Sequence, residues 1–155
     1  MVQEVTYHPI GVVENDFIIS GNPKQIRNSS SCLVIDEKYV PALQGLECFK
    51  HALVIYHLDR SPGYREKVHP MGDSSLAKRG VLATRSPCRP NTLAVTVVEI
   101  LEVKGNRILV TGLDALHGTP ILDIKPYEEH FDNPLGLLWE KDPSYRPVDR
   151  MRTKA

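Results

Sequence analysis

The sequence predicts an all-β fold, a small closed or partly open β-barrel with short helical turns and no Rossmann architecture. The clearest signal is a hairpin of residues 92–104 and 107–113, whose strands carry apolar residues on both faces. Such strands are typical of a closed barrel or of a dimer interface, because a one-sided sheet alternates apolar and polar residues more strictly. Long amphipathic helices are absent, and no Gly-x-Gly occurs in the chain, which argues against a dinucleotide-binding or methyltransferase Rossmann fold.

Three elements are expected in the first part of the chain. Residues 7–14 include His-Pro-Ile-Gly-Val-Val-Glu, which predicts a strand that begins near a proline and tolerates one glycine. Residues 20–31 are polar and lack periodicity, so we expect a surface loop of the kind that forms a flap. Residues 32–36 predict a short apolar strand.

The middle of the chain alternates between a turn, a strand and a loop. Residues 40–49 predict one helical turn, with Pro41 near its first position and Gly45 at its end. Residues 49–59 are rich in β-formers, and their continuous apolar stretch predicts a strand buried on both faces. Residues 60–78 contain turn formers without an apolar period, which predicts a long loop of the kind that binds ligands.

The hairpin turn and the C-terminal region complete the domain. Gly105 and Asn106 join the two hairpin strands, and both residue types accept the positive φ of a tight two-residue turn. The residues beyond Tyr127 suggest short turns, and residues 143–155 form a charged tail with little apolar surface to bury. Because 155 residues suit one core, we assign residues 1–142 to one β-barrel domain and the remainder to the tail.

Charge is distributed unevenly in this chain, although its net charge is zero. Nineteen basic and nineteen acidic residues balance, which argues against a general nucleic-acid coat protein. Residues 60–89 nevertheless hold seven basic side chains and two acidic ones. The basic residues are Arg60, Arg65, Lys67, Lys78, Arg79, Arg85 and Arg89. Such a run is commonly just a solvated surface, but here it overlaps a stiff loop and so also suits a polyanion held beside a pocket.

Location is inferred from the N-terminus and the cysteines. The first residues show no basic segment followed by an apolar core, and no apolar run reaches transmembrane length. Cys32, Cys48 and Cys88 are an odd number without Cys-x-x-Cys spacing, so we interpret them as reduced thiols. These observations predict a cytoplasmic protein with no membrane segment.

The stiff loop lies within residues 80–98, between two apolar runs. Pro87 and Pro90 fix their own φ and favour extended backbone in the residues before them. Arg85 and Arg89 therefore leave the main chain in set directions. A rigid pair of arginines suits an anionic or planar ligand.

Five sequence blocks in this loop and beyond it resemble the signature of a known family. The blocks are Arg85-Ser86, Arg89-Pro90-Asn91, Leu113-Asp114, Gly118-Thr119-Pro120 and Asp123-Ile-Lys-Pro-Tyr127. From about Ile10 to Tyr127 the chain is similar to the TsaA-like family, also called TrmO, whose members are tRNA methyltransferases on a small β-barrel that use S-adenosyl-L-methionine (SAM). The resemblance implies methyl transfer from SAM to N6 of threonylcarbamoyl-adenosine next to the tRNA anticodon. It also implies a homodimer.

The resemblance further implies which residues act. The cofactor contacts that it implies are Gln25, Ile26, Arg27, His57, Leu58, Arg85, Arg89, Asp123, Ile124, Lys125 and Pro126. Because the methyl group of SAM is already activated, the protein mainly positions the acceptor and removes one proton. We expect Asp123 or Tyr127 to accept or relay the N6 proton. We expect Lys125, Arg89 or Arg60 to bind the threonyl carboxylate.

Two rival functions stay open at this point. His57 and Asp59 alternate onto one face of a strand and suggest a metal-dependent hydrolase on a similar barrel. Other side chains suited to complete such a site are His69, Asp73, Asp114, His117 and Asp123. The metal signal is weak because no His-x-x-x-His or cysteine pair fixes two ligands locally, and we assign no metal ligand. The other rival is a catalytically silent RNA- or nucleotide-binding module.

Overall fold

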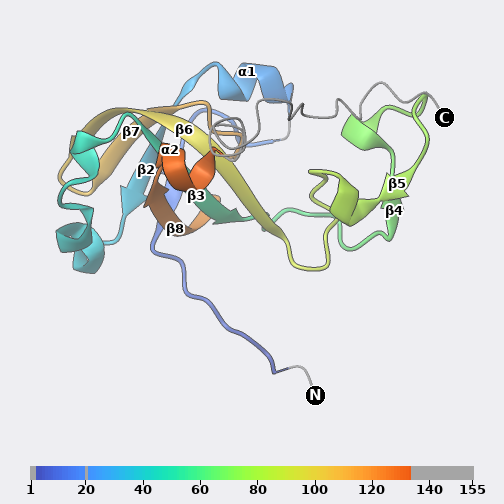
Figure 1. The fold of residues 1–155 in the computed structure, drawn as a ribbon, viewed down its shortest axis with the longest axis horizontal. Coiled ribbons are helices and arrows are strands. Elements are labelled where there is room, and N and C mark those ends of the chain that lie inside the picture. The colour runs from blue at the N-terminus through green and yellow to red at the C-terminus, as the bar shows by residue number, and fades with distance from the viewer. Residues whose placement is uncertain (1–2, 20, 134–155) are drawn as a thin grey trace.

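Six antiparallel strands close into a barrel in the computed structural model, which describes residues 3–19 and 21–133 (Figure 1). The order around the barrel is β1-β2-β7-β6-β3-β8. The strands are β1 (Gly11–Glu14), β2 (Ser30–Ile35), β3 (His51–His57), β6 (Leu93–Lys104), β7 (Arg107–Thr111) and β8 (Pro120–Pro126). The predicted all-β barrel is confirmed in its closed form, although the first strand begins at Gly11 rather than at residue 7.

Short helices and one two-stranded ribbon fill the connections. They are α1 (Pro23–Arg27), α2 (Glu129–Asp132), the 3₁₀ helices η1 (Glu37–Leu43), η2 (Leu46–Cys48), η3 (Pro70–Gly72) and η4 (Val81–Ala83), and strands β4 (Lys67–Val68) and β5 (Arg79–Gly80). The predicted single turn is thus two 3₁₀ helices separated at Gly45, which has a φ of 92°, and Pro41 lies inside η1 rather than at its start. Within the described ranges, no helix has the length and apolar character needed to cross a bilayer.

Burial along β3 shows how the barrel encloses its core. Ala52, Val54 and Tyr56 point inward and are at most 3% exposed, while the residues between them are half-buried. Successive side chains of a strand point to opposite faces, and a closed barrel encloses one of those faces. The prediction that this strand is buried on both faces is therefore wrong, because its outer face is only partly covered.

Gly11 permits a close approach between two strands of the barrel. It pairs with Ile35 on β2 and with Ile121 on β8. A Cβ atom at this position would lie 2.2 Å from the carbonyl oxygen of Val34. Only glycine tolerates such a distance, so the glycine in the predicted first strand is what lets the strands meet here.

The hairpin of β6 and β7 is confirmed, with Gly105 and Asn106 at its turn. Gly105 has the positive φ, 59°, that was expected of both residues. Asn106 instead binds the end of β2: its carbonyl accepts from the Ile35 N–H at 2.8 Å, and its Nδ2 donates to the Ile35 carbonyl at 3.1 Å. The turn therefore anchors the hairpin to a neighbouring strand.

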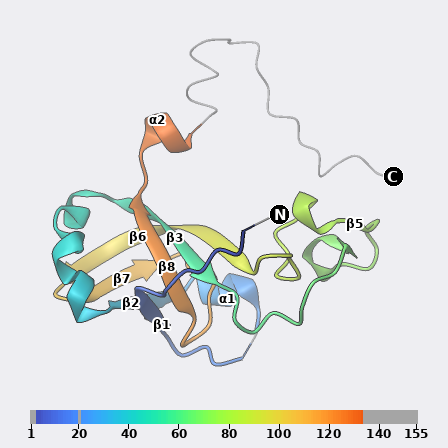
Figure 2. The same ribbon diagram turned by 90° about the horizontal axis from the view of Figure 1, so that it is seen from below.

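A second region, residues 60–89, stands apart from the barrel, and we call it the basic lobe (Figures 1 and 2). Part of the loop predicted for residues 60–78 is ordered here, because β4 pairs with β5 and η3 lies between them. Val68, Val81 and Cys88 form a core separate from that of the barrel. The boundary placed at residue 142 and the tail at 143–155 lie outside the described residues.

The two ends of the barrel differ in what covers them. η1 and η2 lie between the end of β2 and the start of β3, and Leu43 and Leu46 pack against the barrel core at that end. The basic lobe lies between the end of β3 and the start of β6, at the opposite end (Figure 1). The end next to the lobe holds a cavity.

Candidate functional site at the lobe end of the barrel

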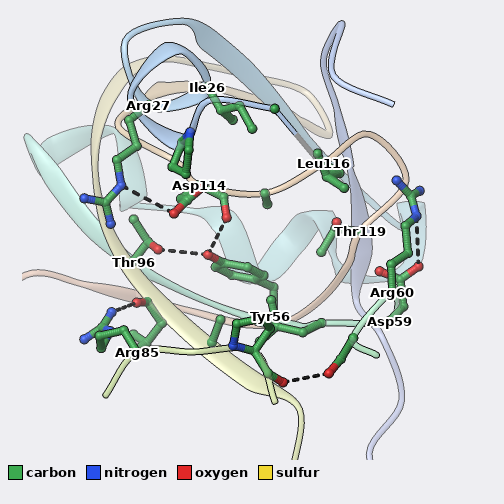
Figure 3. A pocket seen from close by; sticks show the side chains of 18 residues that line it. Ile26, Arg27, Tyr56, Asp59, Arg60, Arg85, Thr96, Asp114, Leu116 and Thr119 are labelled. Carbon is green, nitrogen blue, oxygen red and sulfur yellow. Dashed lines mark hydrogen bonds and ion pairs between the residues drawn. The ribbon is translucent and has the colours of Figure 1, made fainter. Parts of the chain in front are cut away.

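A cavity of about 280 Å³ opens at the barrel end beside the basic lobe (Figure 3). Its lining comes from α1, β3, β6, both ends of the basic lobe and the loop before β8. The lining residues are Gly21, Pro23, Ile26, Arg27, Tyr56, Leu58, Asp59, Arg60, Ser61, Arg85, Pro87, Ala94, Val95, Thr96, Asp114, Ala115, Leu116 and Thr119. The volume is near the lower limit of small-molecule pockets, roughly 300 Å³, so the cavity suits a nucleoside-sized group.

Tyr56 carries the buried polar group of the cavity. Its hydroxyl donates to the Asp114 carbonyl at 2.8 Å and lies 3.0 Å from Thr96 Oγ1, which donates to it in return. Burial raises the pKa of Tyr56, while the hydrogen bond from Thr96 opposes this shift. The phenol is therefore neutral at physiological pH and acts as a hydrogen-bond donor that joins three wall segments, not as a base.

Helix α1 forms one wall, where the sequence suggested only a polar loop. The Asn22 side chain caps the helix by accepting from the Lys24 N–H at 3.0 Å, and Pro23 occupies the first turn. Ile26 is 3% exposed and faces the cavity, which fixes the helix against the barrel (Figure 3). The Asn-Pro pair was the sequence signal for this helix.

Arg27 joins α1 to the loop after β7. Its Nε lies 3.7 Å from Asp114 Oδ2, and its carbonyl accepts from the Gly112 N–H at 3.0 Å. Both charged side chains remain about half or one-third exposed, at 52% and 36%. The ion pair is therefore accessible to a ligand as well as to solvent.

Arg60 closes the opposite wall. Its guanidinium donates to the carbonyls of Ile18 at 2.8 Å and His117 at 2.6 Å, and its Nε lies 3.7 Å from Asp59 Oδ2. One side chain thus joins the loop after β1 to the loop before β8. Arg60 is one of the three side chains that the sequence offered for the substrate carboxylate, but these contacts use most of its donors on the protein itself.

Arg85 leaves the stiff loop and reaches β6, where it donates to the Val95 carbonyl. Its guanidinium stays exposed at the cavity wall, on the same side as Arg27 and across from Arg60 (Figure 3). Carboxylates from Asp59 and Asp114 and several apolar side chains complete the lining. The arrangement suits a ligand with a flat apolar ring, hydroxyl groups and charges of both signs.

Four of the cofactor contacts expected from the resemblance line this cavity: Ile26, Arg27, Leu58 and Arg85. Gln25 lies on α1 outside the lining, where its carbonyl accepts from Ser29 Oγ at 2.9 Å.

Two other expected contacts lie near the cavity and face elsewhere. His57 Nδ1 is 3.1 Å from Thr92 Oγ1 at the strand edge. Arg89 is directed into the basic lobe, where it donates to the carbonyls of Thr84 at 2.7 Å and Val81 at 3.3 Å. These two hydrogen bonds hold the stiff loop.

The residues expected on β8 lie elsewhere. Ile124 packs against the barrel core, so its neighbours Asp123 and Lys125 point outward, with 46% and 61% of their side chains exposed. Lys125 Nζ lies 2.9 Å from Asp123 Oδ2, and this hydrogen bond raises the pKa of Lys125. Pro126 ends the strand, and within one chain none of these residues lines the cavity.

Tyr127 follows β8 and lies beside the start of β3. Its N–H donates to the His51 carbonyl at 3.0 Å, and its ring stands edge-on to the His51 ring, with centroids 6.3 Å apart. Burial is the first cause of the raised pKa of Tyr127, followed by the nearby charge of Glu129. The phenol therefore keeps its proton at physiological pH.

The side chains considered for a metal site are dispersed. In the part of the chain that the structure describes, no group of three or more His, Cys, Asp and Glu is arranged to hold a metal ion. His69 Nδ1 contacts the Leu76 carbonyl at 2.8 Å, and Asp73 accepts from Ser75 in a turn of the basic lobe. These side chains are engaged in local structure at separate places.

Tyr56, Thr96 and Thr119 line the cavity and were not expected there. A tyrosine inside the apolar run Ala-Leu-Val-Ile-Tyr resembles an ordinary core residue. The available signal was chemical: a buried phenol needs a hydrogen-bond partner, which indicates a polar group at a barrel end.

Fold and cavity together define a small-molecule-binding β-barrel of non-Rossmann type, with a charged opening beside a basic lobe. The family model for the tRNA-methyltransferase O N-terminal domain matches residues 13–133. The chain belongs to this family, TrmO.

Relatives and solved structures agree with this assignment. The chain is 41% identical over 127 residues to an S-adenosyl-L-methionine-binding protein of Archaeoglobus fulgidus, an alignment that covers 80% of this chain and 90% of the relative. It is 36% identical over 140 residues to the human tRNA (adenine(37)-N6)-methyltransferase, covering 84% of this chain and 32% of that protein. The crystal structure of TrmO from Pseudomonas aeruginosa matches with a TM-score of 0.67 and 29% identity, covering 84% of this chain and 59% of the other. The chain therefore spans nearly all of the archaeal relative and about a third of the human one.

Proposed function

We propose that this chain is a SAM-dependent tRNA methyltransferase that methylates N6 of the adenosine next to the anticodon, with threonylcarbamoyl-adenosine as its substrate. Family membership supports the reaction class, and the relatives named above include both a SAM-binding protein and a tRNA adenine-N6-methyltransferase. The single observation that supports a ligand site in this chain is the cavity at the lobe end of the barrel.

The chemistry of the cavity fits SAM. Ile26, Leu58 and Leu116 offer apolar surface for the adenine ring. Asp59 supplies a carboxylate for ribose hydroxyls, and Arg85 supplies a cation for the carboxylate of the amino-acid part. When bound, SAM supplies an activated methyl group on its sulfonium, so the protein's work is positioning and proton removal.

We propose that Asp123, Lys125 and Tyr127 handle the acceptor rather than the cofactor. Lys125 is a cation at physiological pH, as any exposed lysine is, and its contact with Asp123 raises its pKa further. An ammonium group suits the threonyl carboxylate. The Asp123 carboxylate is the group suited to take the N6 proton, and the Tyr127 hydroxyl is suited to relay it.

A homodimer would bring these two sets of residues together, since in one chain they lie on different surfaces. Leu93, Val97 and Leu101 on β6 are 41%, 46% and 49% exposed, and they form an apolar outer face on the barrel. β3 lies between β6 and β8, so a second copy that covers this face also approaches Asp123 and Lys125. A dimer in light scattering that dissociates on Val97→Glu would support this arrangement, and a monomeric wild type would contradict it.

A cytoplasmic location is part of the proposal. Cys32, Cys48 and Cys88 are free thiols in the structure, which suits a reducing compartment. A tRNA substrate is also found in that compartment. Localisation of a tagged full-length protein would test this.

The first test is a calorimetric titration of the purified, metal-free protein with SAM. We expect saturable binding near one SAM per chain. Asp114→Asn, which removes the partner of Arg27, should weaken binding about tenfold, whereas Asp36→Asn at the other end of the barrel should leave it unchanged. Absence of binding at millimolar SAM would contradict the proposed function.

Methyl transfer is tested next, with threonylcarbamoylated tRNA and labelled SAM. Asp123→Asn and Tyr127→Phe should slow transfer while SAM affinity stays at the wild-type value, because both side chains lie outside the cavity. Unchanged turnover in both variants would remove these residues from the mechanism. Binding of SAM without transfer to any tRNA would favour the second candidate, a non-catalytic SAM-binding module, since the archaeal relative's name states binding alone.

A further inference from the structure

The basic lobe contains two kinds of basic side chain. Three of the seven are engaged by the protein: Arg60 and Arg85 bind backbone carbonyls at the cavity wall, and Arg89 binds carbonyls inside the lobe. The other four make no side-chain hydrogen bond and no ion pair with any described residue. These four are Arg65, Lys67, Lys78 and Arg79. They are thus available to an external anion.

The acidic side chains of the basic lobe do not neutralise these cations. Asp73 is occupied by Ser75, whose N–H and hydroxyl donate to it at 2.9 Å and 2.6 Å. Glu66 forms no ion pair with a described residue. Unpaired cations with so few acidic neighbours create a local positive field on a chain of zero net charge.

The ribbon of β4 and β5 presents two of the cations on its surface. Val68 is buried in the lobe core, so Lys67 beside it points to the outer face. Lys67 pairs with Gly80, which has no side chain to cover it, and Lys78 is exposed next to β5. The lobe's own small core fixes the ribbon and therefore the position of these charges.

An exposed aromatic ring accompanies the charges. Tyr64 is 61% exposed and makes no hydrogen bond or ring contact with a described residue. It precedes Arg65, whose N–H donates to the Cys88 carbonyl at 3.0 Å and so anchors this segment to the other end of the lobe. A ring beside cations is the arrangement that binds unpaired bases, which stack on the ring while the cations contact phosphates.

Both ends of the basic lobe are cavity walls. The chain enters the lobe through Asp59, Arg60 and Ser61 and returns through Arg85 and Pro87, all of which line the cavity. Ser61 Oγ donates to the Pro87 carbonyl at 2.7 Å and joins the two ends. An RNA strand on the lobe would therefore lie next to the cavity opening.

We propose that the basic lobe is the surface that holds the tRNA, with Arg65, Lys67 and Lys78 on the phosphates and Tyr64 stacked on an unpaired base beside the target adenosine. This inference rests on the proposed function for the identity of the RNA. It assigns RNA binding to residues that do not line the SAM cavity.

The test compares two matched double variants of the full chain, Lys67→Gln with Lys78→Gln in the lobe and Lys38→Gln with Lys104→Gln on the barrel. Each pair removes two exposed lysines that have no ion pair with a described residue. Binding of an unmodified tRNA transcript is measured across a salt series. Each phosphate contact contributes roughly 0.7 to 0.9 to the magnitude of the slope of log K against log salt. The slope of the lobe variant should therefore be smaller in magnitude than that of the wild type by about 1.5. Its affinity at 0.1 M salt should fall about thirtyfold, and the barrel variant should match the wild type.

Tyr64→Ala provides a second signature. Loss of one stacked base should weaken tRNA binding about fivefold or more without changing the salt slope. A lobe variant and a Tyr64→Ala variant that both bind tRNA as the wild type does would overturn the proposal, as would a wild type that binds no tRNA.

SAM titration of the same variants separates the two proposals. Wild-type SAM affinity in the lobe variant, together with weakened tRNA binding, is the expected result. A parallel loss of SAM affinity would overturn the assignment, because the lysines would then act on the cavity rather than on RNA. Failure of the wild type itself to bind SAM would overturn the proposed function, while the salt series would still report on the lobe.

Discussion

The barrel and the basic lobe are built on different scales. Thirteen buried residues form the barrel core, while Val68, Val81 and Cys88 make up the core of the lobe. Each barrel strand pairs with a neighbour on both sides, whereas the lobe has one ribbon of two strands that are two residues long each. Because stability follows buried apolar area, the barrel sets the free energy of unfolding and the lobe contributes little to it.

This difference separates the proposed tasks. SAM requires groups held in fixed positions, and the cavity is formed where rigid strands and α1 meet. An RNA backbone is bound by charge over a wider surface, which tolerates a less rigid support. The charges of the cavity wall are engaged with the barrel, whereas four cations of the lobe are not.

The largest expected effect comes from adding one methyl group at Gly11 in the barrel. In Gly11→Ala the new Cβ would meet the Val34 carbonyl oxygen at 2.2 Å, and both atoms belong to paired strands that cannot shift independently. We expect a loss of about 3 kcal/mol in the free energy of unfolding, measured by urea denaturation.

Gly80→Ala in the basic lobe is the matched control. No heavy atom lies within 4 Å of a Cβ added there, and Gly80 has a φ of -52°, which alanine adopts readily. Its free energy of unfolding should stay within about 0.5 kcal/mol of the wild type. Equal destabilisation by the two substitutions would contradict the difference between the regions.

The second prediction concerns the buried phenol of the barrel. Tyr56→Phe removes the hydrogen bonds to the Asp114 carbonyl and Thr96, and we expect a loss of about 1 to 2 kcal/mol at pH 7. Tyr64→Phe on the lobe surface should change nothing measurable, because that hydroxyl has no partner among the described residues. Thermal and urea denaturation compare the two.

The difference between the wild type and Tyr56→Phe should depend on pH. Burial raises the folded pKa of Tyr56, while the unfolded tyrosine ionises near pH 10. The contribution of the neutral phenol is complete below about pH 10 and is lost as the pH rises toward the folded value. The wild type should therefore lose stability more steeply than the variant as the pH rises above about 10, and parallel curves would contradict the buried assignment.

The barrel could be predicted from the sequence because its signals are periodic. Two-faced apolar strands around Gly105 specified the hairpin, and the structure has it. Helix α1 was missed because five mostly polar residues carry no apolar period, and its packing depends on one residue, Ile26. Short elements fixed by tertiary contact lack a strong local signature.

The candidate site was predicted only in part, and the expected residues on β8 that fall outside the cavity lie where the pairing of β8 with β3 is irregular. Ile26, Arg27, Leu58 and Arg85 line the cavity, and the resemblance named all four. On β8 the pairing shifts by one residue between Ile121 and Asp123, because Ile55 pairs with Asp123 and Tyr56 pairs with Ile121. Such an irregularity reverses which side chains face outward, and sequence alternation alone cannot reveal it.

The smallest expected effect is confined to a turn of the basic lobe. Asp73 accepts from the hydroxyl and the N–H of Ser75, and these hydrogen bonds lower the pKa of Asp73, the hydroxyl bond being the larger cause. Because the folded pKa of Asp73 is lowered, the turn is fully stabilised at a pH above the unfolded pKa, near 3.9. The turn loosens as the pH falls through the folded pKa. Because the carboxylate is fully exposed, global unfolding should not report this change.

Hydrogen exchange at the Ser75 amide should report the loosening of this turn. The Val54 amide in the barrel should stay protected over the same pH range. Ser75→Ala should move the midpoint pH of this change in hydrogen exchange back toward the pKa of a free aspartate, whereas Ser74→Ala should leave the midpoint pH unchanged. A barrel amide that loosened together with Ser75 would show that the two regions open as one unit, and the separation between a rigid cavity and an independently fluctuating RNA surface would then be wrong.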